Sequence, residues 1–492
     1  MIFPSKPIFL ELARQGNLIP VYREVIADLE TPVSAFMKLD RGGHTFLLES
    51  VERGGRFGRY SFVGVDPAIV FSMTRGTVKI NDRGRVTERS TDRDPLEELQ
   101  ELMSRYRPVG FGQLPIFYGG AVGYLAYEAV GSFEPRVGRA QTDDLGMPDA
   151  HFMVADKLLI FDHSERRLKI LINVYVDGEP GEAYDQAVAD IEAIFDRLRQ
   201  PVAARFLAPL RDVEAPEPDV NMTREQYVAM TERMQEYIRA GDIFQVVPSQ
   251  RFSVPFHGQP IELYRALRFI NPSPYMFCVK TVDWAIVGSS PETHVRCENG
   301  LVEIRPIAGT RPRRPIPAED DAMAEELLAD PKERAEHVML VDLARNDVGR
   351  VCEFSSVKVT DFMTVERYSH VMHIVSHVVG RLRAGLSAYD VMRATFPAGT
   401  VSGSPKVRAM EIIAELEPTC RAVYSGAVGY FGFSGNLDSC IAIRTALLKN
   451  GKAYLQAGGG LVADSTPMGE YQESVNKAKA GLKAIALAQL FK

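Results

Sequence analysis

Strand-like and helix-like segments follow one another in this chain without a regular strand–helix alternation. Runs of β-branched and aromatic residues dominate its first part, for example "HTFLLESV", "RYSFVGV" and the pair "HFMVADKLLIFD" and "RLKILINVYV" around a polar turn. A regular alternation would build a parallel, doubly wound sheet, whereas a mixed order is typical of α+β proteins. The sequence therefore predicts an α+β fold in which large antiparallel β-sheets are packed with helices, not a doubly wound fold.

Start and stop signals predict several helices. The segment "TREQYVAMTERMQEYIRAG" opens with a capping box formed by Thr223 and Gln226 and ends at Gly241. Pro331 suits the first turn of a second helix, "PKERAEHVMLVDLARND". We expect further helices over residues 181–199, after "SGSPK", and from near Pro467. The chain then adds a glycine-punctuated β series, "AVYSGAVGYFGF", "CIAIRTALLK" and "AYLQAGGGLV".

A linker is predicted over residues 206–222, "FLAPLRDVEAPEPDVNM", where prolines and acids occur without apolar periodicity. We therefore expect an N-terminal domain over residues 1–205 and a catalytic domain over residues 223–492.

Composition narrows the class of partner and the compartment. The chain has 57 Lys and Arg against 64 Asp and Glu, a net charge of −7, and no basic tract, which argues against nucleic acid or an anionic membrane as a partner. No apolar run approaches the ~18 residues of a membrane span, and the N-terminus lacks the pattern of a signal peptide. The five cysteines are widely spaced without a Cys-x-x-Cys, which favours the reducing cytoplasm.

Two predicted helices each carry a Glu-x-x-Glu pair on one face. Glu333 and Glu336 lie in the first of them, and Glu470 and Glu473, followed by Lys477, in the last. Such a pair is usually a solvated face. Two pairs also suit a hard divalent cation such as Mg²⁺, which takes oxygen ligands and keeps coordination positions for a substrate anion. The spacing alone leaves both interpretations open.

Three glycine-rich stretches are candidate anion or substrate sites. "FPAGTVSGSPKVRAMEI" runs from a loop into a helix, whose N–H groups suit an anion, but it lacks the Gly-Lys-Ser/Thr ending of a Walker A loop. "AGGG", with Gly458, Gly459 and Gly460, is either a turn or a place where bare backbone approaches a ligand. Gly309 and Thr310 lie beside a basic cluster, in a solvated loop or in a site.

A histidine and an arginine complete the candidates from pattern. His373 lies between His370 and His377 in "YSHVMHIVSHV", which is either a core element or a metal set. Arg444, in the predicted strand "CIAIRTALL", is a cation among apolar residues. It either pairs with an acid or clamps a substrate carboxylate.

Several motifs, in this order, make the chain resemble the chorismate-utilising enzymes: "PIAGTRPR", "EHVMLVDLARND", "FPAGTVSGSPK", "YSGAVGY", "IAIRT", "AGGG" and Glu-x-x-Glu-x-x-Asn-Lys-Ala. With "LLES" and "NPSPYMF" added, it resembles the large component of anthranilate synthases. The resemblance extends from about residue 40 to 480 and implies the chorismate-utilising fold. It also implies conversion of chorismate and ammonia to anthranilate and pyruvate through 2-amino-2-deoxyisochorismate, the first committed step towards tryptophan.

The resemblance assigns roles to the candidate residues. It implies a Mg²⁺ ion between the two glutamate pairs, with Glu336 and Glu473 as leading ligands, gripping the ring carboxylate of chorismate. It implies that the general acid for the C4 hydroxyl is Glu292 and that His373 acts in the loss of pyruvate. Other positions match the substrate site: Arg444, Tyr424, Gly459 and Gly460 at the enolpyruvyl carboxylate, and Gly309, Thr310, Thr400, Gly458 and Lys477 around them, with Thr400 also counted as catalytic.

Two positions separate close relatives. Isochorismate and salicylate synthases carry a water-activating lysine where this chain has Gln245, and aminodeoxychorismate synthases commonly carry a nucleophilic lysine where it has Ala308. Both differences favour anthranilate. The complete set of acids, histidine and arginine argues against a catalytically inactive amino-acid sensor.

Regulation and a partner are also implied. In the family a tryptophan feedback site joins "LLES" to "NPSPYM", which here means Glu49, Ser50, Asn271, Pro274, Tyr275 and Met276. No cysteine lies in the Gly-x-Cys-x-Gly elbow of a glutamine amidotransferase. We therefore expect a separate amidotransferase subunit (component II) to supply ammonia, in a heterotetramer.

Overall fold

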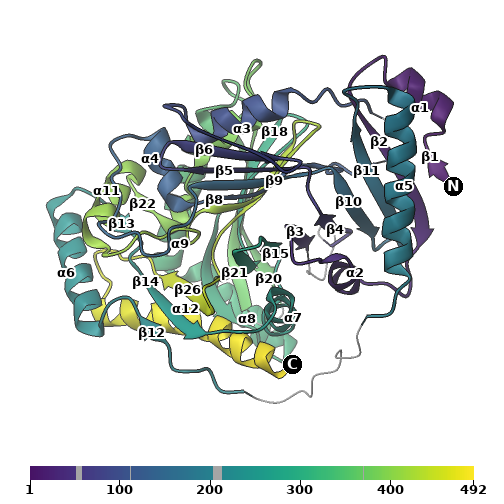
Figure 1. Ribbon diagram of the computed structural model, residues 1–492. Helices are drawn as coiled ribbons and strands as arrows, with labels where there is room; N and C mark the ends of the chain where they lie inside the picture. Colours follow the sequence, from purple (N-terminus) through teal and green to yellow (C-terminus); the bar gives the residue numbers. More distant parts are fainter. Residues whose placement is uncertain (51–57, 111, 113, 203–212, 369–370, 492) are drawn as a thin grey trace.

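The computed structural model describes residues 1–50, 58–110, 112, 114–202, 213–368 and 371–491 (Figure 1). Within these residues the chain forms two twelve-stranded sheets, and neighbouring strands in them pair antiparallel. The predicted α+β class with large antiparallel sheets is confirmed.

The first sheet runs from edge to edge in the order β1 (Ile2–Phe3), β2 (Leu18–Ile26), β11 (Arg167–Tyr175), β10 (Lys157–Asp162), β4 (Tyr60–Val65), β3 (Thr45–Glu49), β15 (Tyr275–Lys280), β16 (Trp284–Ser290), β25 (Thr445–Lys449), β26 (Lys452–Gly458), β14 (Ser249–Pro255) and β12 (Asp219–Val220).

The second sheet runs in the order β19 (Ile307–Pro312), β21 (Val371–Arg381), β18 (Leu301–Ile304), β17 (Thr293–Glu298), β24 (Leu437–Ile441), β23 (Ala427–Gly432), β8 (Gly120–Leu125), β9 (Ala150–Ala155), β5 (Ile69–Thr74), β6 (Thr77–Asp82) and β7 (Arg85–Ser90), with β20 (Lys358–Arg367) also paired to β21. A separate short pair joins β13 (Gln245–Val246) to β22 (Gly403–Ser404).

The helices are α1 (Lys6–Leu12), α2 (Pro32–Leu39), α3 (Pro95–Ser104), α4 (Val130–Phe133), α5 (Pro180–Leu198), α6 (Arg224–Ala240), α7 (Pro260–Ile270), α8 (Pro317–Ala329), α9 (Pro331–Gly349), α10 (Ala388–Thr395), α11 (Lys406–Leu416) and α12 (Pro467–Ala488). Short 3-10 turns are η1 (Tyr127–Ala129), η2 (Gly399–Val401) and η3 (Gln489–Phe491). None of the described helices is both long and apolar enough to cross a membrane.

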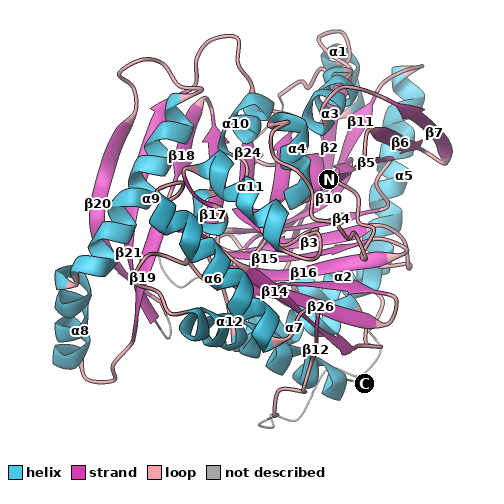
Figure 2. Ribbon diagram, turned by 90° about the vertical axis from the view of Figure 1, so that its left-hand side faces the viewer, coloured by secondary structure: helices cyan, strands magenta, loops and turns pink. Residues whose placement is uncertain are grey.

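The two sheets enclose a shared apolar core and carry helices on their outer faces. Phe277 of β15 and Ile286 of β16 belong to the same buried cluster as Met153 of β9 and Val428 of β23. On the outer face of the first sheet, α1, α2, α5, α7 and α12 bury a second cluster; Figure 1 shows α5 lying along β2 and β11. On the second sheet, α9 and α10 cover β18 and β17, as Figure 2 shows.

Several connections lead from a strand of one sheet directly into a strand of the other. Residues 291–292 join β16 to β17, and residues 442–444 join β24 to β25. These two crossovers touch, because the Ile441 N–H donates to the Glu292 carbonyl (3.1 Å) and the Ser289 N–H donates to the Arg444 carbonyl (3.1 Å). Glu292 and Arg444, both predicted to act on the substrate, therefore lie in neighbouring crossovers, where the two sheets meet.

The two sequence segments predicted as domains share both sheets. In the first sheet β3 pairs with β15, and in the second β8 pairs with β23. Both sheets therefore cross the predicted boundary. Residues 206–212 of the predicted linker lie outside the described residues. Its later part is not irregular throughout, because Asp219–Val220 forms edge strand β12 against β14.

The predicted helix boundaries are confirmed within one or two residues. The capping box of Thr223 and Gln226 is formed, and Gly241 ends α6 with a left-handed φ of 84°. Strand boundaries differ more. "HFMVADKLLIFD" splits into β9 and β10, in different sheets, at Asp156. Asp156 turns there because its carboxylate accepts the Ala68 N–H (2.9 Å) at a neighbouring crossover.

Candidate active site

Both glutamate pairs lie near the N-terminal ends of their helices. α9 begins at Pro331 after an Asp330 cap, whose carboxylate accepts the N–H groups of Lys332 (2.9 Å) and Glu333 (3.2 Å). α12 begins at Pro467 after a Thr466 cap. Carboxylates near these ends are favoured by the free N–H groups and the helix dipole. The predicted helices therefore carry their acids at one end.

The charges of the two glutamate pairs affect each other's pKa values. Burial raises the pKa of Glu336, and the charges of Glu333 and Glu473 raise it further. Burial also raises the pKa of Glu470, again with a contribution from Glu473. Glu473 on α12 thus acts on a carboxylate of α9 as well as on its own neighbour. The two pairs therefore lie close enough to influence each other's protonation, although the Glu473 side chain is itself exposed.

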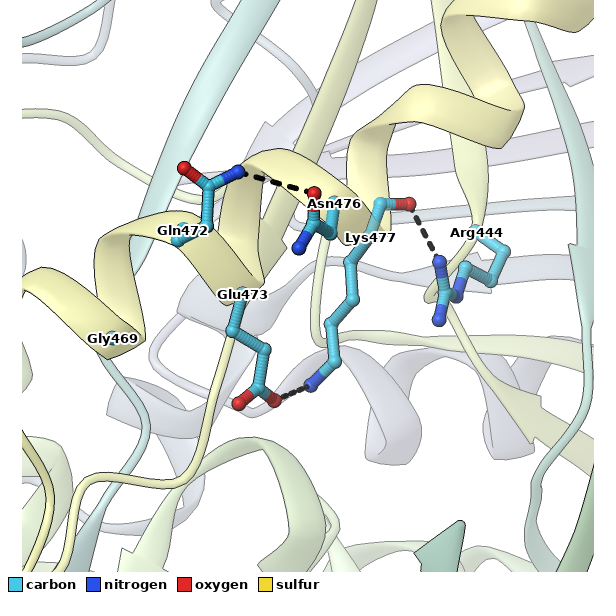
Figure 3. A pocket seen from close by; sticks show the side chains of 6 residues that line it. All are labelled: Arg444, Gly469, Gln472, Glu473, Asn476 and Lys477. Atoms are coloured by element: carbon cyan, nitrogen blue, oxygen red, sulfur yellow. Dashed lines mark hydrogen bonds and ion pairs between the residues drawn. The ribbon is translucent and has the colours of Figure 1, made fainter. Parts of the chain in front are cut away.

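The carboxylates of the two glutamate pairs lie near one another but are not arranged as a set of metal ligands. Glu333 forms an ion pair with Arg311 (3.0 Å) and Glu473 one with Lys477 (2.7 Å; Figure 3). Among the described residues, no group of three or more His, Cys, Asp or Glu side chains is arranged to hold a metal ion. Glu470 Oε2 is nonetheless buried without a hydrogen-bond partner. Oxygen donors of this kind fit a hard divalent cation.

The glycine run after β26 fits against these acids. A β-carbon at Gly459 would lie 2.5 Å from Glu470 Oε2 and 3.0 Å from Glu473 Oε1, so only glycine is accommodated without displacing a carboxylate. A β-carbon at Gly460 would lie 3.8 Å from Glu336 Oε1, which brings the α9 acids to the same loop. Lys477 donates to the Gly458 carbonyl (2.9 Å).

Arg444 lies in the crossover between β24 and β25, not in a strand as predicted. Its backbone has a left-handed φ of 52°, an unfavourable conformation for a residue with a side chain. The guanidinium donates to the Lys477 carbonyl (2.5 Å), and no described acid lies in ion-pair range of it. With Glu473 and Lys477 it lines a cleft of about 590 Å³ along α12 (Figure 3). This half-buried cation is positioned for a carboxylate from outside the chain.

Glu292 lies in the other crossover, beside Thr400 of η2. Both line a small cavity under α9. Burial raises the pKa of Glu292 to about 7, although the Thr400 side chain and the Lys477 charge lower it. A substantial fraction of this carboxyl is therefore protonated at neutral pH, which is the state that a general acid needs. The segment "FPAGTVSGSPK", predicted to lead directly into a helix, contains η2 and β22 before α11 begins. Thr400 is therefore separated from α11 by the short strand β22.

His373 of β21 contacts Gly309 and Thr310 of β19. His373 Nδ1 lies 2.8 Å from the Gly309 carbonyl and 3.1 Å from Thr310 Oγ1. Burial lowers the pKa of His373. Because a carbonyl only accepts, Nδ1 carries the proton and Nε2 has a free lone pair. Gly309 has a φ of 67°, and a β-carbon there would lie 3.0 Å from Glu333 Oε2.

The histidine cluster is not a metal site among the described residues. His377, on the same strand, contacts Thr360 (3.0 Å), Asp361 (3.7 Å) and Glu303 (3.8 Å). His370 lies outside the described residues.

Tyr424 is half-buried beside the site. Its ring lies 5.6 Å from the guanidinium carbon of Arg421. Arg421 was not predicted as a site residue. Nothing in the segment "EPTCRAVYSG" distinguishes a buried arginine from one on the surface.

The segments predicted to form a feedback site meet as neighbouring strands. Met276 of β15 pairs with Glu49 of β3. The Glu49 carboxylate accepts from Tyr264 OH (2.5 Å) and Ser61 Oγ (3.2 Å), whereas Ser50 Oγ is buried without a hydrogen-bond partner. Asn271 donates to Ser289 Oγ (3.1 Å). Pro274 precedes β15 in the same turn.

Comparison with known proteins assigns the family. A family model described as chorismate binding enzyme matches residues 43–483. The chain is 48% identical to anthranilate synthase component 1 of Pseudomonas aeruginosa over 98% of both chains. The chain belongs to the anthranilate synthase component 1 family of chorismate-binding enzymes. A crystal structure of anthranilate synthase component I from Streptococcus pneumoniae is 38% identical, covers 94% of this chain and 99% of its own, and superposes with a TM-score of 0.77.

The fold is also found outside the anthranilate synthases. The menaquinone-specific isochorismate synthase of Escherichia coli, at 18% identity, covers 98% of both chains with a TM-score of 0.70. This likeness shows the shared fold alone.

Proposed function

We propose that this family member converts chorismate and ammonia to anthranilate and pyruvate through 2-amino-2-deoxyisochorismate. The observation that supports the proposal is that Lys477, which lines the cleft with Arg444 and Glu473, also acts electrostatically on the buried Glu292, while Glu473 acts on Glu336 of the other glutamate pair. A protonated acid suits a leaving hydroxyl, and a cation suits a carboxylate. Chorismate carries both of these groups.

The first stage replaces the C4 hydroxyl. Glu292 donates its proton to this oxygen, and the C4–O bond breaks to release water while the ammonia nitrogen bonds to C2 and both ring double bonds shift, from C1=C2 and C5=C6 to C1=C6 and C4=C5. The added nitrogen then releases a proton, so chorismate and ammonia give 2-amino-2-deoxyisochorismate and water. Arg444 and Tyr424, with the N–H groups of Gly459 and Gly460, hold the enolpyruvyl carboxylate. A bound Mg²⁺ would neutralise the glutamate pairs and hold the ring carboxylate.

The second stage removes pyruvate. His373 Nε2 takes the C2 proton, the C3–O bond breaks and the ring becomes aromatic. The Gly309 carbonyl keeps the other nitrogen protonated (2.8 Å) and so presents the lone pair of Nε2. The C3–O bonding electrons leave with pyruvate as its enolate, and the methylene carbon of the enolate then takes up a proton to give the keto acid.

A direct assay tests this function. Purified chain with chorismate, ammonium and Mg²⁺ is expected to produce anthranilate, followed by its fluorescence, and pyruvate in equal amounts. Formation of isochorismate or 4-amino-4-deoxychorismate instead would contradict the proposal. The expected product is favoured because Gln245 cannot act as a base for water and Ala308 offers no amine.

Two partners belong to the same proposal. Tryptophan is proposed to bind at the end of the β3–β15 pair, where the unpartnered Ser50 hydroxyl lies near the Asn271–Met276 segment. A separate glutamine amidotransferase, component II, is proposed to deliver ammonia in a heterotetramer. The five cysteines are free and buried, which supports the reducing cytoplasm as the site of action.

A further inference from the structure

Arg421 is a buried arginine whose side chain bonds to two other loops and to Ser425 of its own loop. It follows α11 and is 2% exposed. Its Nη1 donates to the Val401 carbonyl (2.8 Å) and its Nη2 to the Val247 carbonyl (2.6 Å). Nη1 also lies 3.2 Å from Ser425 Oγ. The remaining bonds, from Nε and Nη2, reach the two carboxylate oxygens of Glu417 (2.8 and 2.6 Å).

These bonds use the full capacity of the guanidinium. An arginine has five N–H donors in a fixed planar fork, and the five bonds occupy them all. A salt bridge with Glu417 alone would need only two. The other three set the positions of main-chain or hydroxyl oxygens in different parts of the chain, which a lysine or an apolar side chain has no means of doing.

Each of the three loops carries a residue that faces the proposed substrate. Val401 directly follows Thr400 in η2. Val247 follows β13, whose Gln245 side chain reaches the Gly460 loop. Ser425 directly follows Tyr424, whose ring lies 5.6 Å from the guanidinium carbon.

The loops that contain Val247 and Val401 are joined to each other independently of Arg421. β13 pairs with β22, and the Val247 N–H donates to the Ser402 carbonyl (3.0 Å). The guanidinium therefore locks an already paired unit to the Tyr424 loop. Loosening it is expected to change the spacing between Thr400 and Tyr424 rather than to unfold either loop.

The arginine is itself held from the other half of the sequence. The Glu128 carboxylate accepts the N–H groups of Arg421 (2.7 Å) and Ala422 (3.0 Å). Glu417 also accepts the N–H (2.9 Å) and hydroxyl (2.8 Å) of Ser249 at the start of β14. The cation is thus paired, fully bonded and fixed against both sheets, so it is a rigid reference point.

We propose that Arg421 is a positioning residue of the active site, which sets the relative placement of Thr400, Gln245 and Tyr424 through its bonds to their loops and does not touch the substrate. A misplacement of about 1 Å costs up to about 100-fold in rate, so loss of this fork is expected to lower turnover strongly. The kinetic part of this inference rests on the proposed function.

The test removes the fork without leaving a buried charge. The double variant Arg421→Met with Glu417→Gln is neutral, and replacement of a buried ion pair by groups of similar volume is commonly tolerated. Arg251→Met is the matched control: Arg251 is also buried and bonds to Asp144 (2.7 Å) and to the Cys420 carbonyl (3.2 Å) in the Arg421 loop, but it does not join that loop to Val401 or Val247. Arg421→Lys keeps the charge and loses the fork.

Two readouts separate positioning from general stability. Hydrogen exchange of the amides at 245–248, 399–404 and 423–426 is expected to quicken about tenfold or more in the double variant, with the β15 and β23 amides unchanged. kcat for anthranilate is expected to fall about 10- to 100-fold, with the Arg251→Met enzyme within about twofold of wild type. Arg421→Lys is expected to lie between them.

Several results would overturn the proposal. Exchange that quickens equally across both sheets would show a structural role only, and so would equal losses in the double variant and in Arg251→Met. Should the double variant not fold, Arg421→Lys decides: wild-type kcat and loop exchange in that variant would remove Arg421 from a positioning role. Wild-type enzyme that makes no anthranilate would refute the proposed function, while the exchange data would still judge the loop contacts.

Discussion

The catalytic role proposed for Glu292 comes with a cost to folding. Burial raises its pKa from an ordinary 4.5 to about 7, so the folded state favours the protonated form. The stabilising effect of this preference is present at low pH and is lost as pH rises through about 7. At pH 8 the ionised carboxylate costs the fold up to about 3 kcal/mol. Replacement by Gln removes this cost.

We therefore expect Glu292→Gln to be more stable than wild type at pH 8, by up to about 3 kcal/mol, and nearly equal to it at about pH 4, below the ordinary carboxyl pKa of 4.5. Urea unfolding at the two pH values measures this difference. The same variant is expected to lose most turnover, because the amide has no proton to donate to the C4 hydroxyl. Equal stability at both pH values would contradict the buried, protonated carboxyl.

The pH dependence of the wild-type rate follows from the same group. With ammonium as donor, the supply of NH₃ rises with pH, whereas protonated Glu292 decreases above about 7. Expressed per NH₃ concentration, kcat/KM is expected to be level below that pH and to fall about tenfold per pH unit above it. A steady-state pH series at constant NH₃ tests this. A value per NH₃ that stays constant from pH 6 to pH 9 would remove Glu292 as the acid.

The glutamate pairs make a matched test of the metal proposal. Glu336→Gln and Glu473→Gln each keep shape and remove a negative charge, and each is expected to lower turnover at least about 100-fold and to raise the Mg²⁺ concentration needed for activity. Glu101→Gln, in a Glu-x-x-Glu pair on α3 whose Glu101 is paired with exposed Arg93, is the control and should match wild type. Normal Mg²⁺ dependence in both site variants would exclude these ligands.

Residue types could be predicted from the sequence, but not their electrostatic state. The acids, the glycines and His373 stand in recognisable motifs. That Glu333 pairs with Arg311, and that Glu470 Oε2 is left without a partner, depends on residues distant in sequence. The five bonds of Arg421 involve loops up to 174 residues away, which no local pattern indicates.

At the scale of elements, helices were predicted better than strands. Helices announce themselves locally, as with Pro331, Pro467 and the Thr223 capping box. A strand that ends so that the next can enter another sheet looks the same in sequence as one that continues. "CIAIRTALLK" therefore reads as one strand although β24 and β25 lie in different sheets with Arg444 between them. The breaks between strands that the sequence does not reveal contain two of the candidate site residues, Glu292 and Arg444.

The pairing of β3 with β15 is the element-level test of feedback. Ser50 ends β3 beside the turn that precedes β15, and its hydroxyl is buried without a partner. Ser50→Phe is expected to fill this position, leaving kcat within about twofold while raising the tryptophan concentration for half inhibition at least about tenfold. Inhibition curves for mutant and wild type measure this. Superimposable curves would exclude Ser50 from the tryptophan site.

At the scale of the molecule, both sheets span the sequence from the N-terminal to the C-terminal segment. β3 and β15 bring the proposed tryptophan segments together, and Tyr275 at the start of β15 donates to Asp438 (2.8 Å) of β24 in the other sheet. Tyr275 OH also lies 3.1 Å from Thr293 Oγ1, next to Glu292. Tyr275 therefore contacts β24, which leads into the Arg444 crossover, and Thr293, which follows Glu292. We propose that tryptophan bound beside β15 is coupled to the site through these contacts.

The nitrogen source is also a property of the whole molecule. Hydrolysis of glutamine requires a reactive thiolate, and all five cysteines are buried thiols. Burial raises the pKa of Cys297 and Cys352 to about 11 and that of Cys420 to about 12, and it raises the pKa of Cys278 and Cys440 as well. At neutral pH none of them supplies the nucleophile.

The purified chain alone is therefore expected to make anthranilate from ammonium, increasingly so as pH rises towards 7 and NH₃ becomes available, but not from glutamine. Addition of a separate glutamine amidotransferase subunit is expected to restore the glutamine-dependent reaction, and an amidotransferase whose catalytic cysteine is replaced by alanine serves as the control. Anthranilate fluorescence with each nitrogen donor measures the difference. Efficient glutamine use by the chain alone, with no glutaminase contaminating the preparation, would contradict the requirement for a partner, because no thiol of this chain is ionised or exposed to carry the reaction.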